Sequence, residues 1–192
     1  SSYIRSNNNY NSATHKGYIY SYYSLDKNLN ILSSGTISLG EFYPQGIIML
    51  DDKIFYYIDD VKMLYRSIDS KKENPIFQFP KDIIEVKKSC NKIVVLLEDS
   101  LYIVSNNGVV EKSLNLIGDR HGFIAKSLVS SGENILQVYL EGPETQIVRT
   151  FTLTGVPINE YIVDRRVVGD AITVDNSEII YSDGEYIYLN SL

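Results

Sequence analysis

Apolar and polar positions along this chain form short runs that are typical of β-strands. Stretches of about four to eight residues rich in Ile, Val, Leu and Tyr are separated by Asp, Asn, Gly and Ser. No segment keeps an apolar stripe at helical spacing, because the best candidate, 114–126, is interrupted by Gly118 and Gly122. The pattern predicts an all-β chain.

One strong strand recurs five times along the sequence. The five runs are 17–23, 53–58, 92–97, 134–140 and 178–181. Subtracting the numbers of their anchor residues Ile19, Ile54, Ile93, Ile135 and Ile179 gives spacings of 35, 39, 42 and 44 residues. A period of about 40 residues is typical of the four-stranded blade of a propeller.

The neighbours of each anchor strand recur as well. An acidic turn follows each anchor strand, at Asp26, Asp59, Glu98, Glu141 and Asp183. A second strand follows each turn, a third strand follows in the first four units, and a further strand precedes the anchor of units two to five. The sequence therefore predicts four-stranded antiparallel meanders, in units of about 1–40, 41–80, 81–118, 119–164 and 165–192.

The two ends of the chain differ from the other units. In the first unit the second and third strands are predicted over 29–32 and 36–39, and the last unit ends after its third strand. We expect Tyr3–Ser6 to supply the missing strand of the last unit, because closing a ring protects the strand edges.

By period and pattern, the chain resembles the β-propeller repeat proteins from about Tyr18 to Leu192. It contains no Trp, no Trp-Asp pair and no kelch Gly-Gly pair, which argues against the WD40 and kelch subfamilies. The segment 54–66 is similar to the Tyr-Tyr…Leu-Tyr-Arg repeats of certain bacterial propellers. The resemblance implies a rigid toroid used mostly for binding, and the repeat count predicts a single, small five-bladed β-propeller domain over 1–192.

Charge and cysteine content limit the partners. Lys and Arg number 18 against 24 Asp and Glu, a net charge of −6, so we expect no nucleic-acid partner. No apolar run is long enough to span a membrane. Cys90 is the single cysteine and no Asn-x-Ser/Thr sequon occurs, which favours a soluble intracellular protein.

Sequence signatures of enzymes are missing. There is no P-loop, no Gly-x-Ser-x-Gly, no His-Glu-x-x-His and no cysteine pair, and His15 and His121 are the only histidines. We therefore expect no cofactor, no metal and no catalytic residues. A glycoside hydrolase, which would need converging carboxylates, remains an alternative, although acidic residues also serve hairpin turns.

The loops that join one predicted blade to the next carry the candidate binding residues. These are Phe42, Tyr43, Lys81, Asp119, Arg120, His121, Asp164, Arg165 and Arg166. Arginine and aromatic residues are enriched at protein–protein hot spots, whereas a solvated loop needs neither. We expect these loops to share a face with the acidic turns. The predicted function is a non-catalytic binding or scaffolding domain with a protein partner, and the alternative is a lectin-like domain that binds carbohydrate through its tyrosines.

Overall fold

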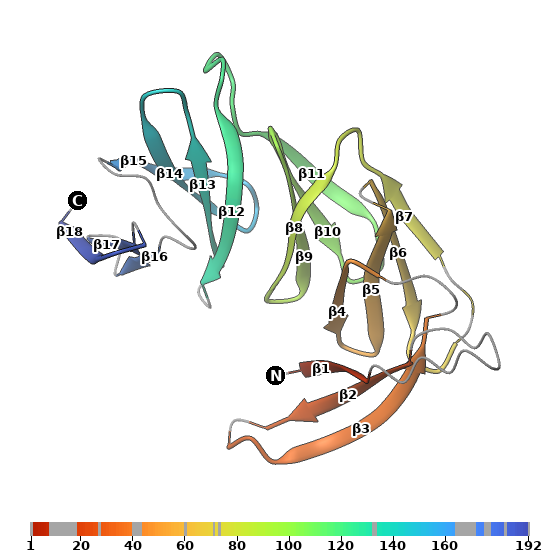
Figure 1. The fold of residues 1–192 in the computed structure, drawn as a ribbon. Coiled ribbons are helices and arrows are strands. Elements are labelled where there is room, and N and C mark those ends of the chain that lie inside the picture. Colours follow the sequence, from red (N-terminus) through yellow and green to blue (C-terminus); the bar gives the residue numbers. More distant parts are fainter. Residues whose placement is uncertain are drawn as a thin grey trace. The chain divides into compact units, whose positions relative to one another are not determined.

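The computed structural model describes residues 2–7, 19–26, 28–39, 44–59, 61–70, 72, 74–131, 134–163, 172–174, 178–182 and 184–191. All regular elements in these ranges are β-strands, as predicted (Figure 1). In chain order they are β1 (Ser2–Asn7), β2 (Ile19–Leu25), β3 (Ile31–Ser38), β4 (Gly46–Leu50), β5 (Lys53–Asp59), β6 (Lys62–Ser67), β7 (Asn74–Gln78), β8 (Ile83–Ser89), β9 (Lys92–Leu97), β10 (Ser100–Ser105), β11 (Val110–Asn115), β12 (Ile124–Ser131), β13 (Ile135–Glu141), β14 (Gln146–Thr152), β15 (Pro157–Val163), β16 (Ile172–Val174), β17 (Glu178–Ser182) and β18 (Ile187–Ser191).

The strands form antiparallel sheets in which chain order is also spatial order. In the described ranges these are sheet A (β1–β3), sheet B (β4–β7), sheet C (β8–β11), sheet D (β12–β15) and sheet E (β16–β18). Sheets B, C and D have four strands each, which confirms the predicted meanders. Each sheet also lies inside one of the predicted sequence units.

The chain divides into two compact units, 1–80 and 81–192, and the division falls at a predicted repeat boundary. Unit 1 has its core between sheets A and B, formed by Tyr20, Ile37, Leu39, Ile54, Tyr56 and Leu64. Unit 2 has its main core between sheets C and D, and Tyr188 of β18 packs against a smaller cluster on sheet D. Nothing tests the predicted single domain, so it stays a prediction.

Burial explains why the anchor strands were easy to predict. In β9, every residue from Ile93 to Leu97 is fully buried, so both faces of the strand are covered. A strand covered on both faces needs a continuous apolar run rather than alternation. The run Ile54–Tyr56 in β5 is buried in the same way.

The outer strands end in a repeated arrangement. A buried apolar residue lies at or directly after the end of β3, β7, β11 and β15: these are Leu39, Phe79, Leu116 and Val163. In sheet B the N–H of Phe79 donates to the carbonyl oxygen of Val61 at 2.8 Å, and in sheet C the N–H of Leu116 donates to that of Asp99 at 2.8 Å. The sequence period therefore recurs as a structural repeat.

The first unit differs from the prediction. The two strands expected over 29–32 and 36–39 are one continuous strand, β3, paired with β2. Its central Gly35 lies opposite Tyr22, and a Cβ at that position would come within 2.6 Å of the Tyr22 hydroxyl oxygen. The glycine therefore makes room for an aromatic ring instead of ending the strand.

The predicted role of the N-terminal strand is wrong. β1 pairs with β2 in sheet A, from Ser2 opposite Ser24 to Asn7 opposite Ile19. It thus occupies the first-strand position of sheet A instead of completing the last sheet. Pairing with a strand nearby in sequence closes a much shorter loop and costs less chain entropy.

Candidate functional site

Four loops meet at one end of sheets C and D, and we call this surface the loop face. The loops are 80–82, 98–99, 116–123 and 142–145. The N–H groups of Leu116 and Ala125 donate to the carbonyl oxygens of Asp99 and Glu98, both at 2.8 Å. Both ends of the 116–123 loop are thereby attached to the acidic turn between β9 and β10. In this unit, inter-sheet loops and acidic turns do share a face.

Lys81 forms ion pairs with two acidic residues of the loop face. Its Nζ lies 2.8 Å from Oδ2 of Asp99 and 3.9 Å from Oε2 of Glu98. The hydrogen bond from Lys81 lowers the pKa of the Asp99 carboxyl, although burial opposes the shift, and the same bond raises the pKa of Lys81. Both side chains remain more than 40% exposed, so the pair can also contact a partner.

The 116–123 and 142–145 loops, at the adjoining ends of β12 and β13, also pack closely together. Nζ of Lys126 lies 3.3 Å from Oε2 of Glu141. A Cβ on Gly142 would come within 2.5 Å of the Phe123 ring, so this glycine permits the close approach of the two loops. A hollow of about 610 Å³ lies between the 80–82 and 98–99 loops and the start of β12, lined by Lys81, Asp82, Ile84, Glu98, Ile124, Ala125 and Lys126.

Arg120, another predicted binding residue, turns away from the hollow toward sheet D. Its Nη2 donates to Oε1 of Glu160 on β15 at 2.6 Å, and its Cζ lies 6.0 Å from the centre of the Phe123 ring. Its neighbours Asp119 and His121 are exposed on the same loop. The predicted residues of this loop therefore divide between the loop face and the side of sheet D.

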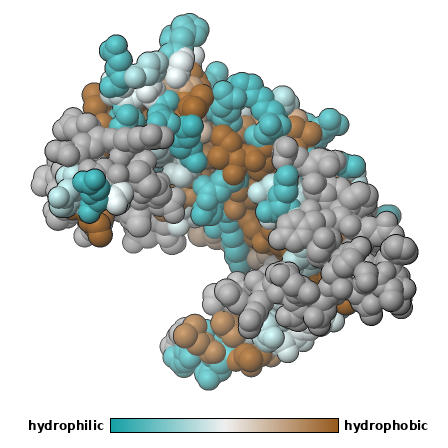
Figure 2. Space-filling model, viewed as in Figure 1, coloured by the Kyte–Doolittle hydropathy of each residue, from teal (hydrophilic) through white to brown (hydrophobic). Residues whose placement is uncertain are grey.

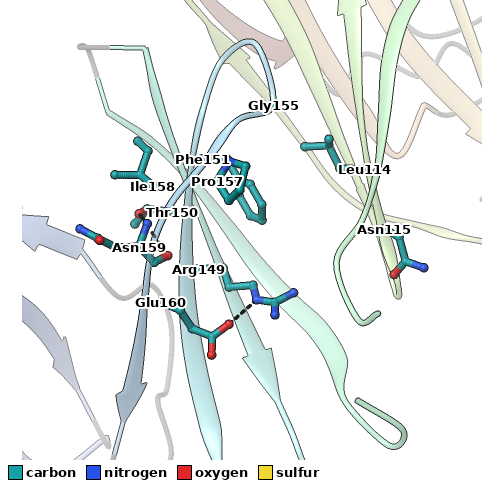
Figure 3. A pocket seen from close by; sticks show the side chains of 10 residues that line it. All are labelled: Leu114, Asn115, Arg149, Thr150, Phe151, Gly155, Pro157, Ile158, Asn159 and Glu160. Atoms are coloured by element: carbon teal, nitrogen blue, oxygen red, sulfur yellow. Dashed lines mark hydrogen bonds and ion pairs between the residues drawn. The ribbon is translucent and has the colours of Figure 1, made fainter. Parts of the chain in front are cut away.

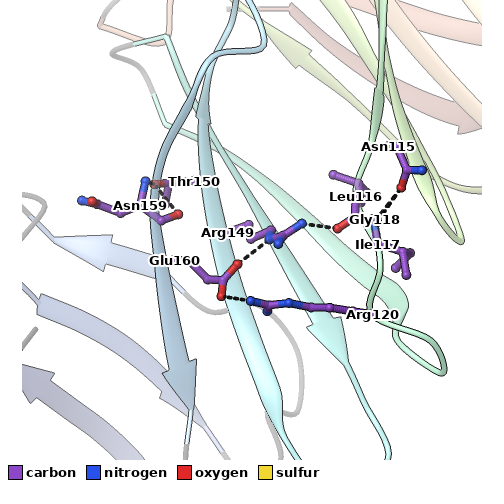
Figure 4. A network of polar contacts seen from close by, with 9 residues as sticks. All are labelled: Asn115, Leu116, Ile117, Gly118, Arg120, Arg149, Thr150, Asn159 and Glu160. Carbon is purple, nitrogen blue, oxygen red and sulfur yellow. Dashed lines mark hydrogen bonds and ion pairs between the residues drawn. The ribbon is translucent and has the colours of Figure 1, made fainter.

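A second arginine completes this network. Nε of Arg149, on β14, donates to Oε2 of Glu160 at 2.6 Å, and its Nη1 donates to the carbonyl oxygen of Leu116. Figure 4 shows both guanidinium groups pointing at the one carboxylate, with Arg149 reaching from sheet D to the end of β11. The network thus links three segments: the 116–123 loop, β14 and β15.

Burial and hydrogen bonding act in opposite directions on Glu160. Burial raises the pKa of the Glu160 carboxyl, but the hydrogen bonds from Arg149 and Arg120 outweigh it, and the pKa is lowered overall. Glu160 is therefore ionised at neutral pH, and two cations share one anion.

Beside this network, a groove of about 490 Å³ separates β11 from the β14–β15 pair (Figure 3). Its lining residues are Leu114, Asn115, Arg149, Thr150, Phe151, Gly155, Pro157, Ile158, Asn159 and Glu160. In Figure 3 the side chains of Phe151, Pro157 and Arg149 point toward β11, where Leu114 faces them. The groove therefore has an apolar part and a charged end.

The opposite end of the groove is also fixed. Nζ of Lys112 on β11 donates to the carbonyl oxygen of Thr154 at 2.9 Å. Gly155 has φ +77°, and a Cβ there would come within 2.9 Å of both Leu114 and Lys112. The β14–β15 turn thus packs tightly onto β11, and the groove lies between two points where the sheets are joined.

The remaining predicted site residues lie outside the described part of the chain. These are Phe42, Tyr43, Asp164, Arg165 and Arg166. Of the acidic turns, Asp183 is also outside it, whereas Asp26 accepts the N–H groups of Asn28 and Asn30 at 2.7 and 2.9 Å. Asp26 therefore serves its own turn, as Asx chemistry predicts.

Sequence reasoning missed Arg149 and Glu160. They lie directly opposite each other across β14 and β15, where unlike charges stabilise strand pairing. Both strands were predicted from the sequence, but their register was not, and the register alone brings these two side chains together.

The described ranges contain neither a cluster of metal-binding side chains nor a membrane-spanning helix. They hold no group of three or more His, Cys, Asp or Glu side chains arranged to bind a metal ion. Among the same residues, no helix has the length and apolar character needed to cross a membrane.

No protein-family model and no curated protein sequence matches the chain. Solved structures of β-propeller proteins do resemble it. BamB from Moraxella catarrhalis has 13% sequence identity and a TM-score of 0.57 over 92% of this chain and 53% of that one. BBS1N, solved in complex with ARL6DN, has 13% identity and a TM-score of 0.58 over 93% and 59%. KlAtg21, solved with the coiled coil of AgAtg16, has 15% identity and a TM-score of 0.58 over 90% and 62%.

The chain spans only about half to three fifths of the length of these solved chains. At such low identity the likeness concerns the fold and carries no function. Together with the antiparallel four-stranded sheets, it shows that the chain has a β-propeller fold.

Proposed function

We propose that this chain is a non-catalytic binding domain, each of whose five sheets is one propeller blade, and that it binds a protein partner through the loop face of unit 2. The observation that supports the proposal is the hollow on the loop face, with Lys81 and Lys126 on its lining and the half-exposed carboxylates of Glu98 and Asp99 beside Lys81. Mixed charges around a concave surface favour a polar protein partner and steer its approach. The five blades and the protein partner are the predictions made from the sequence, retained here as part of the proposal.

Two of the similar structures support this class of function. BBS1N was solved in complex with ARL6DN, and KlAtg21 with the coiled coil of AgAtg16. Two proteins of similar fold were thus solved bound to another protein. The loop face offers this chain an ordered surface for the same purpose, because its loops are joined by backbone hydrogen bonds and ion pairs.

Charge reversal on the loop face tests the proposal. The test variant carries Lys81→Glu and Lys126→Glu, and the control carries Lys88→Glu, an exposed lysine near the other end of β8. The wild-type domain and both variants are used to capture proteins from the native source, and the captured proteins are quantified by mass spectrometry. We expect a defined set of proteins to be lost with the double variant and kept with the control.

Circular dichroism and the thermal midpoint show whether each variant is folded. Surface ion pairs of this kind contribute only about 0–1 kcal/mol, so both variants should fold. Equal capture by all three domains would overturn the assignment of the loop face.

A further inference from the structure

The groove between β11 and the β14–β15 pair has more cationic than anionic groups around it. Arg149 and Arg120 share the single carboxylate of Glu160, and Lys112 lies at the opposite end, bonded to a backbone oxygen. This local excess of positive charge stands in a chain whose net charge is −6. The local positive charge therefore favours binding of an anionic ligand in this groove, whereas the net negative charge of the chain repels anions elsewhere.

Arg149 and Arg120 each have N–H donors that their described hydrogen bonds do not use. Arg149 uses its Nε and Nη1, and Arg120 uses its Nη2, in the hydrogen bonds described above. A guanidinium has more N–H groups than these bonds use, and its planar geometry suits a carboxylate. The side chains are 23% and 38% exposed, so a ligand can reach them.

The rest of the groove is apolar and elongated. Phe151 and Pro157 lie on one side of it, and Leu114 of β11 faces them from the other (Figure 3). Its lining follows β15 from Pro157 to Glu160, about 10 Å at strand spacing, and continues to Gly155 at the turn before β15. That length matches a short extended peptide better than a compact small molecule.

Backbone edges are also available beside the groove. β11 and β15 are the outer strands of sheets C and D, and no strand in the described part of the chain pairs with their outer edges. An extended peptide can add hydrogen bonds to such an edge while its side chains occupy pockets.

We propose that this groove binds a short extended segment of a partner protein, in which an apolar side chain lies against Leu114, Phe151 and Pro157 and an acidic side chain reaches Arg120 and Arg149. The inference rests on the proposed protein-binding function and adds a second contact site with its own ligand chemistry. In the free domain Glu160 holds the two guanidinium groups in place and competes with the acidic side chain of the ligand.

Two substitutions that break the same ion pair should change the affinity for an acidic peptide in opposite directions. Arg120→Gln removes a donor to the ligand, whereas Glu160→Gln removes the competing carboxylate and leaves both guanidinium groups without an anionic partner. The probe is a fluorescein-labelled Glu-Leu-Glu-Leu-Glu peptide, measured by fluorescence polarisation. We expect Arg120→Gln to weaken binding about tenfold and Glu160→Gln to strengthen it several-fold.

Controls fix the ligand class and the location. A Lys-Leu-Lys-Leu-Lys peptide should bind more weakly than the acidic one, and Lys87→Gln, on β8, should leave affinity unchanged. Methyl NMR should show shifts at Leu114 on addition of the acidic peptide. Octanoate is the second probe, because a free carboxylic acid has the same chemistry as the peptide side chains.

Several results would overturn the inference. These are no binding of the acidic peptide up to about 1 mM, equal binding of the basic peptide, binding of octanoate but not of peptide, or loss of binding in both Arg120→Gln and Glu160→Gln. The last result would indicate that the ion pair only supports the fold. If protein capture still depends on Lys81 and Lys126 while the peptide fails to bind, the groove assignment is wrong and the proposed function stands.

Discussion

Oε2 of Glu85 accepts the backbone N–H of Leu128 at 2.7 Å, which joins β8 of sheet C to β12 of sheet D across 43 residues of sequence. β8 and β12 are the first strands of their sheets and pack against each other (Figure 1). The register of β8 shifts between Ile83 and Glu85, and that of β12 shifts between Ala125 and Ser127. β12 is an edge strand of sheet D, so alternate N–H groups along it point away from β13, and the Glu85 carboxylate accepts the one from Leu128.

We expect Glu85→Ala to lower the free energy of unfolding by about 1–3 kcal/mol, because the N–H of the buried Leu128 then loses its acceptor. Glu85→Gln keeps a carbonyl oxygen in place and should cost less. Lys87, whose Nζ lies 2.6 Å from Oε1 of Glu85, provides the control. Lys87→Ala should change stability by less than about 1 kcal/mol in urea unfolding; equal losses for Glu85→Ala and Lys87→Ala would contradict the bridging role.

The β14–β15 turn should be sensitive to any side chain at Gly155. Gly155→Ala meets both a positive φ and the side chains of Leu114 and Lys112. Gly118→Ala has a positive φ of +58° but open space around the added carbon, so it measures backbone strain alone, about 1–2 kcal/mol. Thermal or urea unfolding should show a larger loss for Gly155→Ala, and a loss no greater than that of Gly118→Ala would show that the turn does not pack on β11 as described.

The buried arginine of unit 1 should be replaceable. Arg66 is only 6% exposed, its Nη2 donates to the carbonyl oxygen of Ser38 at 2.6 Å, and its Nε has no hydrogen-bond partner. No carboxylate in the described residues forms an ion pair with it. Arg66→Met removes a buried charge and an unpaired donor, while Ser38, which is exposed, can bond to water. We expect the urea midpoint to stay the same or rise, and a large fall would contradict this account.

Acidification should weaken the pair between Lys81 and Asp99. The Lys81 hydrogen bond lowers the pKa of Asp99 in the folded state, with burial opposing and the Ser100 hydroxyl assisting. The stabilisation is therefore complete above the unfolded-state value of about 3.9 and disappears as the pH falls through the lowered folded-state pKa. Lys81→Ala should raise the Asp99 pKa toward its ordinary value in a carboxyl NMR titration. The pair is half-exposed, so the accompanying loss of stability should be small, and an unchanged Asp99 titration would exclude Lys81 as the cause.

The anchor strands could be predicted from the sequence, whereas contacts that depend on how strands pair could not. Ile93–Leu97 form an apolar run because both of their faces are covered, and such burial leaves a clear pattern. The predicted break between strands 29–32 and 36–39 was wrong, because the reason for Gly35, the Tyr22 ring opposite, depends on strand register. The same holds for Arg149 and Glu160, which are 11 residues apart in sequence and adjacent only after β14 and β15 pair.

Of the candidate site, the loops of the third and fourth units were predicted in the right place, but the directions of their side chains were not. Lys81 remains on the loop face, whereas Arg120 bonds to Glu160 on sheet D. Composition identifies a loop rich in charged and aromatic residues. The positions of the neighbouring strands determine which carboxylate each basic side chain pairs with.

The 116–123 loop begins and ends on a single turn, since Leu116 and Ala125 both bond to the backbone of residues 98 and 99. Its base is therefore held independently of the exposed residues Gly118 and Asp119, and a Cβ added at Gly118 meets open space. Such a segment can accept insertions or foreign sequence at little cost to folding. A protein engineer can therefore graft a recognition peptide between Gly118 and Asp119, as long as Leu116, Arg120 and Phe123 keep their contacts with sheet D and the neighbouring loop.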